Sequence, residues 1–190
     1  MRILRMIVLL LFTLVACQQH TPNVKEIDMY NASGDKVGTA KLSSQPDGVK
    51  IKVKVEGLTP GFHGIHIHEY AKCEGPEFKT AGNHLNPEGK QHGLMNPKGS
   101  HLGDLPNIKA KDDGKVDTEV TVNGATIQEG KKSLLKGEGT SLIITEGQDD
   151  GMSQPAGDSG VRKICGEIKP KKDVDSEKKP TDPTELEDKE

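Results

Sequence analysis

Residues 49–56 read Val49-Lys50-Ile51-Lys52-Val53-Lys54-Val55-Glu56, a strict alternation of apolar and charged side chains. Successive side chains of a β-strand point to opposite faces, so this order places valine and isoleucine on one face and the charges on the other. That arrangement is typical of an antiparallel strand with one face in a core and the other in solvent. The segment therefore predicts a protein built on half-exposed β-strands.

Shorter segments elsewhere in the chain have a similar character and are separated by turn-forming residues. Turns are predicted at residues 33–35, 45–48 and 112–114, where Gly, Pro, Asp and Ser are combined. No stretch has the period of a long helix, so we predict an all-β fold, a sandwich or a barrel. Besides residues 49–56, the predicted strands are Glu26–Asn31, Lys36–Ser43, Lys115–Val122, Ser141–Thr145 and Lys163–Ile168.

Histidines are concentrated in one Gly- and Pro-rich third of the chain. Imidazole is the commonest protein ligand for zinc and copper, so this density suggests metal binding. A single loop histidine is more often a solvated or hydrogen-bonded side chain than a ligand, so the spacing has to support the inference. Six of the seven histidines belong to this region, and Asp104 follows the last of them: His63, His66, His68, His84, His92 and His101.

Two different patterns occur within the region. His66 and His68 alternate with isoleucines, so in a strand both imidazoles share one face and form a chelating pair for a cation. The later residues are spread along a loop that needs something to hold it in a compact domain. They supply three nitrogens and one carboxylate oxygen, a complete tetrahedral zinc set with no open position, as in structural sites. These residues are His84, His92, His101 and Asp104.

The N-terminal residues 1–16 have the features of an export signal, since Arg2 and Arg5 precede an apolar run too short to span a bilayer. The following Leu-Val-Ala-Cys ends at Cys17 and resembles the lipobox of bacterial lipoproteins, whose cysteine is lipidated after cleavage. We therefore expect an exported protein, lipid-anchored at the outer face of a bacterial cell membrane or in the periplasm. The alternative is an ordinary signal peptide with an incidental cysteine.

The remaining sequence is divided into a linker, one domain and a tail. We assign residues 17–25 to the linker, 26–168 to the domain and 169–190 to the tail. The tail has almost no apolar residues and is predicted to be disordered, and its mixed charges argue against a nucleic-acid partner. Within the domain, Cys73 and Cys165 are predicted to form a disulfide, as expected in an exported protein. The sequence gives no oligomeric state.

Residues 61–69, Gly-Phe-His-Gly-Ile-His-Ile-His-Glu, resemble the histidine-rich signature of the copper/zinc superoxide dismutase family. The resemblance extends from about Glu26 to Ile168 and implies a Greek-key β-barrel whose long loops carry the metals. It also implies conversion of superoxide to oxygen and hydrogen peroxide, and it places Cys73 and Cys165 where the family has its intrachain disulfide. The other matching segments, in family order, are residues 82–87, 91–93, 101–105, 149–150 and 160–166.

The same resemblance assigns roles to individual residues. Asp149 matches the carboxylate that links a copper ligand, His66, to a zinc ligand, His92. Arg162 matches the arginine that attracts superoxide, so Arg162 and His84 are the expected catalytic residues. His63 is expected to be structural. The implied copper ligands are His66, His68 and His84, and the implied zinc ligands are His84, His92, His101 and Asp104.

One departure from the family pattern concerns copper. Thr145 stands where the family has its last copper-ligating histidine. A neutral hydroxyl is a poor copper ligand, so three nitrogens remain. Cu(I) accepts three ligands whereas Cu(II) prefers four nitrogens, so we expect copper affinity to fall and zinc affinity to be unaffected. His20, the one other histidine, lies near the lipidated end and is not expected to substitute.

A second departure is the segment 151–161, which is shorter than in many family members and contains no lysine. Electrostatic capture of a small anion is therefore expected to be weaker. Three functions stay open: a superoxide dismutase of reduced activity, a zinc-only protein without catalysis, and a Cu(I)-binding or Cu(I)-transferring lipoprotein. Arg162 and Asp149 favour the dismutase, which is the leading prediction, and Thr145 favours the other two. Zinc is the expected cofactor, with copper bound less firmly.

Overall fold

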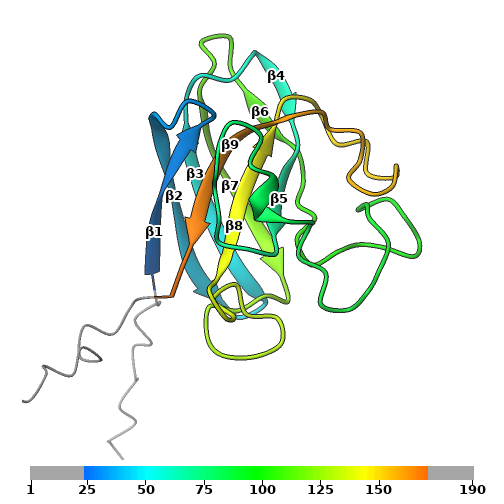
Figure 1. The fold of residues 1–190 in the computed structure, drawn as a ribbon. Helices are drawn as coiled ribbons and strands as arrows, with labels where there is room; N and C mark the ends of the chain where they lie inside the picture. Colours follow the sequence, from blue (N-terminus) through cyan, green and yellow to red (C-terminus); the bar gives the residue numbers. More distant parts are fainter. Residues whose placement is uncertain (1–23, 171–190) are drawn as a thin grey trace, which may run out of the picture.

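The computed structural model describes residues 24–170, which form an all-β structure (Figure 1). The main sheet is antiparallel and curls into a half-barrel, and β4 (Gly61–His63) pairs with β6 (Ile108–Ala110) in a second, two-stranded sheet. The all-β prediction is therefore confirmed. The strands of the main sheet, in spatial order, are β5 (Ile65–His68), β8 (Thr140–Thr145), β9 (Arg162–Ile168), β1 (Val24–Asn31), β2 (Lys36–Gln45), β3 (Gly48–Val55) and β7 (Val116–Asn123).

Strand order differs from chain order in the way that Greek-key folds require. β1, β2 and β3 form a meander, whereas β9 returns to pair with β1, β8 pairs with β5, and β7 pairs with β3. Such long returns are characteristic of Greek-key topology. Two long loops extend to one side of the barrel, away from β1 and β2, and come close to each other there (Figure 1).

All six predicted strands are present, with ends within two residues of the predicted ones. β1 begins at Val24, so the last two residues of the expected linker 17–25 lie in the sheet. β4 and β6 were not predicted, because three residues are too few for an alternation pattern. The export signal, Cys17 and the tail beyond Pro170 lie outside the described residues and stay predictions.

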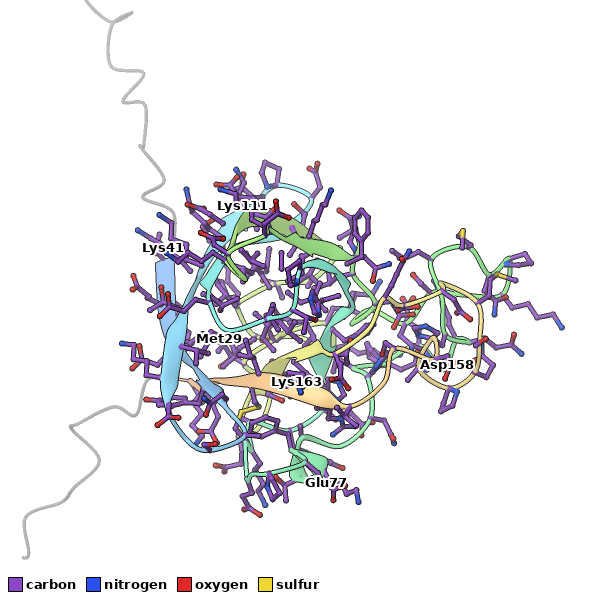
Figure 2. The ribbon with its side chains drawn as sticks, turned by 90° about the horizontal axis from the view of Figure 1, so that it is seen from above. Met29, Lys41, Glu77, Lys111, Asp158 and Lys163 are labelled. Atoms are coloured by element: carbon purple, nitrogen blue, oxygen red, sulfur yellow. A yellow bond between two sulfur atoms is a disulfide. The ribbon has the colours of Figure 1, made fainter. Side chains whose placement is uncertain are left out.

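β3 confirms the face assignment that its sequence predicts. Val49, Ile51 and Val53 are buried in the barrel core, while Lys52 and Lys54 are exposed. Lys54 pairs with Asp117 on the neighbouring β7 at 3.3 Å. Seen from above, the strands surround an interior filled by side chains, and the loop carrying Asp158 extends away from it (Figure 2).

β8 is buried along its whole length because both of its faces are covered. Leu142 and Ile144 belong to the barrel core, whereas Ile143 packs on the outer face against Phe78 and Cys165. The predicted disulfide between Cys73 and Cys165 is present, with 5.7 Å between the Cα atoms. It fastens the loop after β5 onto β9, next to the histidines. Within residues 24–170, no helix has the length and apolar character needed to cross a membrane.

Candidate metal centre

The centre is built on β5 and on the loops that cover its outer face. Ile65 and Ile67 enter the barrel core, and His66 and His68 alternate with them. Short bridges connect His66 to Asp104 and His68 to His84, so the loop from His84 to Asp104 lies directly along β5. The two histidine groups that the sequence separates are therefore adjacent in space.

The candidate zinc set comprises His84, His92, His101 and Asp104, whose ligand atoms all lie within 4.8 Å of one another. Their three Nδ1 atoms lie 2.9, 3.1 and 3.2 Å from the same oxygen, Asp104 Oδ1. Asp104 Oδ2 accepts hydrogen bonds from the backbone N–H groups of Gly93 and His101, which fixes the carboxylate. Three nitrogens and one oxygen that converge in this way fit a tetrahedral Zn²⁺.

The candidate copper set comprises His66, His68 and His84, whose ligand atoms also lie within 4.8 Å of one another. His66 Nε2 is 2.7 Å from Asp149 Oδ2, and His68 Nδ1 is 2.9 Å from the carbonyl oxygen of Gly82. The opposite nitrogens, His66 Nδ1 and His68 Nε2, are buried without a hydrogen-bond partner. Unpaired buried nitrogens are costly, so two of them in one group fit a bound cation.

Asp149 links the two sets, as the family resemblance implies. Its Oδ2 contacts His66, and its Oδ1 lies 3.1 Å from His92 Nε2. Asn107 holds the Asp149 main chain at both ends, because its Oδ1 accepts the Asp149 N–H at 2.9 Å and its Nδ2 donates to the Asp149 carbonyl at 2.8 Å. Sequence reasoning missed Asn107, since a single asparagine before a short strand carries no distinctive spacing.

Thr145 is buried at the end of β8, and its hydroxyl lies 3.1 Å from the carbonyl of Gly147 and 3.2 Å from that of Gly64. The hydroxyl therefore donates to the main chain. The ring nitrogens of His63 lie 2.9 Å from the Thr145 carbonyl and 2.8 Å from the Thr59 carbonyl. Both contacts are to backbone oxygens, and His63 belongs to neither set, which fits its expected structural role.

Arg162 lies beside the candidate copper set. Its Nη1 donates to the carbonyl of Phe78 at 2.7 Å, and its Nη2 donates to the carbonyl of Gly82 at 2.8 Å. Because the Gly82 carbonyl also contacts His68, one backbone atom positions both an imidazole and the guanidinium. A cavity of about 480 Å³ lies here, and Arg162, His68 and Thr145 are among its lining residues.

The short segment 151–161 is fastened to the zinc-side loop by Gln154. Its Oε1 accepts the His92 N–H at 2.9 Å, and its Nε2 donates to the His92 carbonyl at 2.9 Å. Sequence reasoning missed this clamp, as it missed Phe78 and Gly82, because these contacts use main-chain atoms of distant segments. The contact fixes a candidate zinc ligand and one wall of the Arg162 cavity together.

The protonation states of the centre suit a cation. Burial lowers the pKa of His84 to about 4, and burial followed by the charge of His84 lowers the pKa of His68. Burial alone would raise the pKa of Asp104 and Asp149, but hydrogen bonds from histidines and backbone N–H groups outweigh it. The pKa of Asp149 falls to about 2. Neutral imidazoles and ionised carboxylates are the forms that bind metals.

Comparison with known proteins agrees with the family resemblance seen in the sequence. Residues 36–168 match the family model described as copper/zinc superoxide dismutase (SODC). The chain belongs to the copper/zinc superoxide dismutase family. Superoxide dismutase [Cu-Zn] 1 of Aquifex aeolicus (strain VF5) is 46% identical over 144 residues, which cover 75% of this chain and 85% of that relative. Superoxide dismutase-like protein YojM of Bacillus subtilis (strain 168) is 37% identical over 145 residues, 75% of this chain and 74% of that relative.

Solved structures of this dismutase family resemble the chain in three dimensions. The crystal structure of a SOD-like protein from Bacillus subtilis matches with a TM-score of 0.73 and 36% identity, covering 75% of this chain and 97% of that one. Cu/Zn superoxide dismutase from Brucella abortus matches with a TM-score of 0.64 and 34% identity, covering 76% and 99%. The expected Greek-key dismutase fold is therefore confirmed.

The Asp149 carboxylate occupies space that a side chain at Gly157 would need, so a substitution of this glycine tests the role of Asp149. A Cβ at Gly157 would overlap the Asp149 carboxylate and come within 2.8 Å of His92 Nε2. Gly157→Ala should displace Asp149 and lower zinc affinity by about 10- to 100-fold, the usual effect of losing such a supporting partner. Chelator competition measures the affinity.

Gly89→Ala is the matched control for this substitution. Gly89 has a φ of +68°, against +69° for Gly157, and nothing lies within 4 Å of its added Cβ. Both variants therefore have similar backbone strain, and only Gly157→Ala crowds the carboxylate. Equal zinc affinities in the two variants would contradict the role given to Asp149.

The lowered histidine pKa values predict a pH dependence for the metal-free chain. An unfolded histidine binds a proton near pH 6.5, whereas folded His84 does so only near pH 4. The unfolded state therefore holds more protons in this interval, and the free energy of unfolding should fall as pH drops from 6.5 to 4. The lowered pKa of Asp149 reduces the free energy of unfolding further, but only below about pH 4, where this carboxylate is protonated in the unfolded chain. Thermal unfolding between pH 4 and 8 measures this, and greater stability at pH 5 than at pH 7 would contradict it.

Proposed function

We propose that the chain is an exported superoxide dismutase-like metalloprotein with a structural zinc and a weakly held copper. His84, His92, His101 and Asp104 would hold zinc. His66, His68 and His84 would hold copper, with His84 shared between the two. The observation that supports this best is the pair of buried, unpaired nitrogens, His66 Nδ1 and His68 Nε2, close to the cavity that Arg162 lines.

When bound, copper supplies the one-electron chemistry by which one superoxide is oxidised to oxygen and a second is reduced and protonated to hydrogen peroxide. Arg162 attracts and orients the anion, and two backbone carbonyls fix its guanidinium. His84 Nδ1 lies with Asp104 in the zinc set, which leaves Nε2 for the copper set. With a pKa near 4, His84 is neutral at neutral pH, the form in which an imidazole binds a cation.

The copper set is the weaker of the two because Thr145 contributes no nitrogen. Its hydroxyl donates to backbone carbonyls, and the copper group found among residues 24–170 consists of three histidines. The same observation favours a second candidate, a zinc-only protein without catalysis. A three-nitrogen site also suits Cu(I), which supports a copper-handling lipoprotein as a variant of that alternative.

Thr145→His separates these functions. In the chain from Gln18 onward, the variant should raise copper affinity by about tenfold or more and increase superoxide removal, because it supplies the fourth nitrogen. Zinc content should not change. The test measures two quantities for each variant: the copper and zinc content per chain, and the rate of superoxide removal.

The same measurements on the unmodified chain distinguish the dismutase from the zinc-only protein. Full zinc, negligible copper and no superoxide removal would refute the dismutase proposal and leave the zinc-only protein. An unchanged copper affinity in Thr145→His would show that this position does not face the metal.

We also propose that Cys17 is lipidated and anchors the exported chain to a membrane. The Leu-Val-Ala-Cys sequence supports this, and the disulfide fits an oxidising compartment. A labelled fatty acid fed to expressing bacteria should be incorporated into the chain and lost in Cys17→Ser, which should leave the membrane fraction. An unlabelled chain of unmodified sequence would refute the anchor.

A further inference from the structure

β8 ends at Thr145, a buried residue whose small side chain lines a cavity. Thr145 lines the 480 Å³ cavity together with His68, His84 and Arg162. Its hydroxyl is turned to the backbone carbonyls of Gly64 and Gly147, within 3.2 Å of both. Thr145 therefore offers no nitrogen to the cavity, and its hydroxyl is engaged by the main chain.

The cavity has the size and lining to admit a planar ring. Its volume is several times that of an imidazole, and the small residues Ala156, Ser159 and Gly160 are among its lining residues. Ser159 Oγ is engaged with the Ala156 carbonyl at 3.1 Å, so it does not compete for an entering nitrogen. The guanidinium of Arg162 disfavours a protonated ring, which selects the neutral form that binds metals.

The described chain has no histidine of its own to offer at this place. His63 is buried against two backbone carbonyls, and the other five described histidines belong to the zinc and copper sets. Three nitrogens leave Cu(II) short of the four-nitrogen arrangement that it prefers. A fourth imidazole nitrogen would therefore have to come from outside the described residues.

We infer that the pocket beside Thr145 is a binding site for an external imidazole group, which serves as the fourth nitrogen ligand of copper. The inference rests on the proposed copper set. It gives the protein a property that a four-histidine site lacks, since its copper affinity depends on a second ligand. Free imidazole and a histidine side chain of a peptide share this chemistry.

The test titrates the zinc-loaded full chain with buffered Cu(II) in the presence and absence of imidazole. Imidazole should raise Cu(II) affinity by about tenfold or more. Pulsed electron paramagnetic resonance with ¹⁵N-imidazole should detect the labelled nitrogen on the metal. A short peptide with one internal histidine, used in the same titration, shows whether a side chain enters as well as the free ring.

Three variants make the result specific. Thr145→His should bind Cu(II) tightly without imidazole and respond little to it. Thr145→Val matches threonine in shape and lacks the hydroxyl, so it should behave like the unmodified chain; a loss of copper affinity would mean that the hydroxyl is a ligand. His20→Ala should also leave the titration unchanged. If the unmodified chain binds Cu(II) tightly without imidazole and only His20→Ala requires it, then His20 supplies the fourth nitrogen. That result would refute the external site.

The outcomes separate this inference from the proposed function. Copper bound by three histidine nitrogens, with neither affinity nor spectrum altered by imidazole, refutes the external site alone. No copper in either condition refutes the copper set and the external site together. A gain in copper without superoxide removal supports the imidazole site and refutes the dismutase activity.

Discussion

In the candidate copper set, His66 and His68 each have one ring nitrogen held by an oxygen atom of the protein. Such a partner fixes the orientation of the ring and decides which nitrogen remains for a cation. For His66 and His68 the remaining nitrogen is buried and unpaired, so the arrangement is unfavourable unless a cation is present. The oxygens are Asp149 Oδ2 for His66 and the Gly82 carbonyl for His68, whereas His84 Nδ1 lies with Asp104 in the zinc set.

The fold brings these oxygens next to the histidines of β5. The disulfide fastens the loop that carries Gly82 to β9, and that carbonyl holds both His68 and Arg162. Asp149 follows β8, and Asn107 holds its main chain at both ends. The barrel itself supplies a rigid face, because β8 is buried on both sides. Metal ligands, their supporting oxygens and the anion-attracting arginine therefore form one connected unit.

Patterns that are local in the sequence were predictable, and contacts made through distant main-chain atoms were not. Alternation predicts β3 and the shared face of His66 and His68, and turn-forming residues delimit the other five predicted strands. The four zinc-set residues lie between residues 84 and 104, so their spacing alone suggests a site. Asn107 and Gln154 have no such spacing, because their contacts with Asp149 and His92 arise only when separate loops meet. Family resemblance identifies the substitution at Thr145, but only the structure shows where its hydroxyl points.

The central claim is that the zinc set has all four of its ligands whereas the copper set has only three. X-ray absorption at the copper and zinc edges of the metal-loaded, imidazole-free protein tests it most directly. Zinc should show three imidazole nitrogens and one carboxylate oxygen. Copper should show three imidazole nitrogens and no fourth. Four imidazoles at copper, or fewer than three at zinc, would contradict the assignment of the two sets.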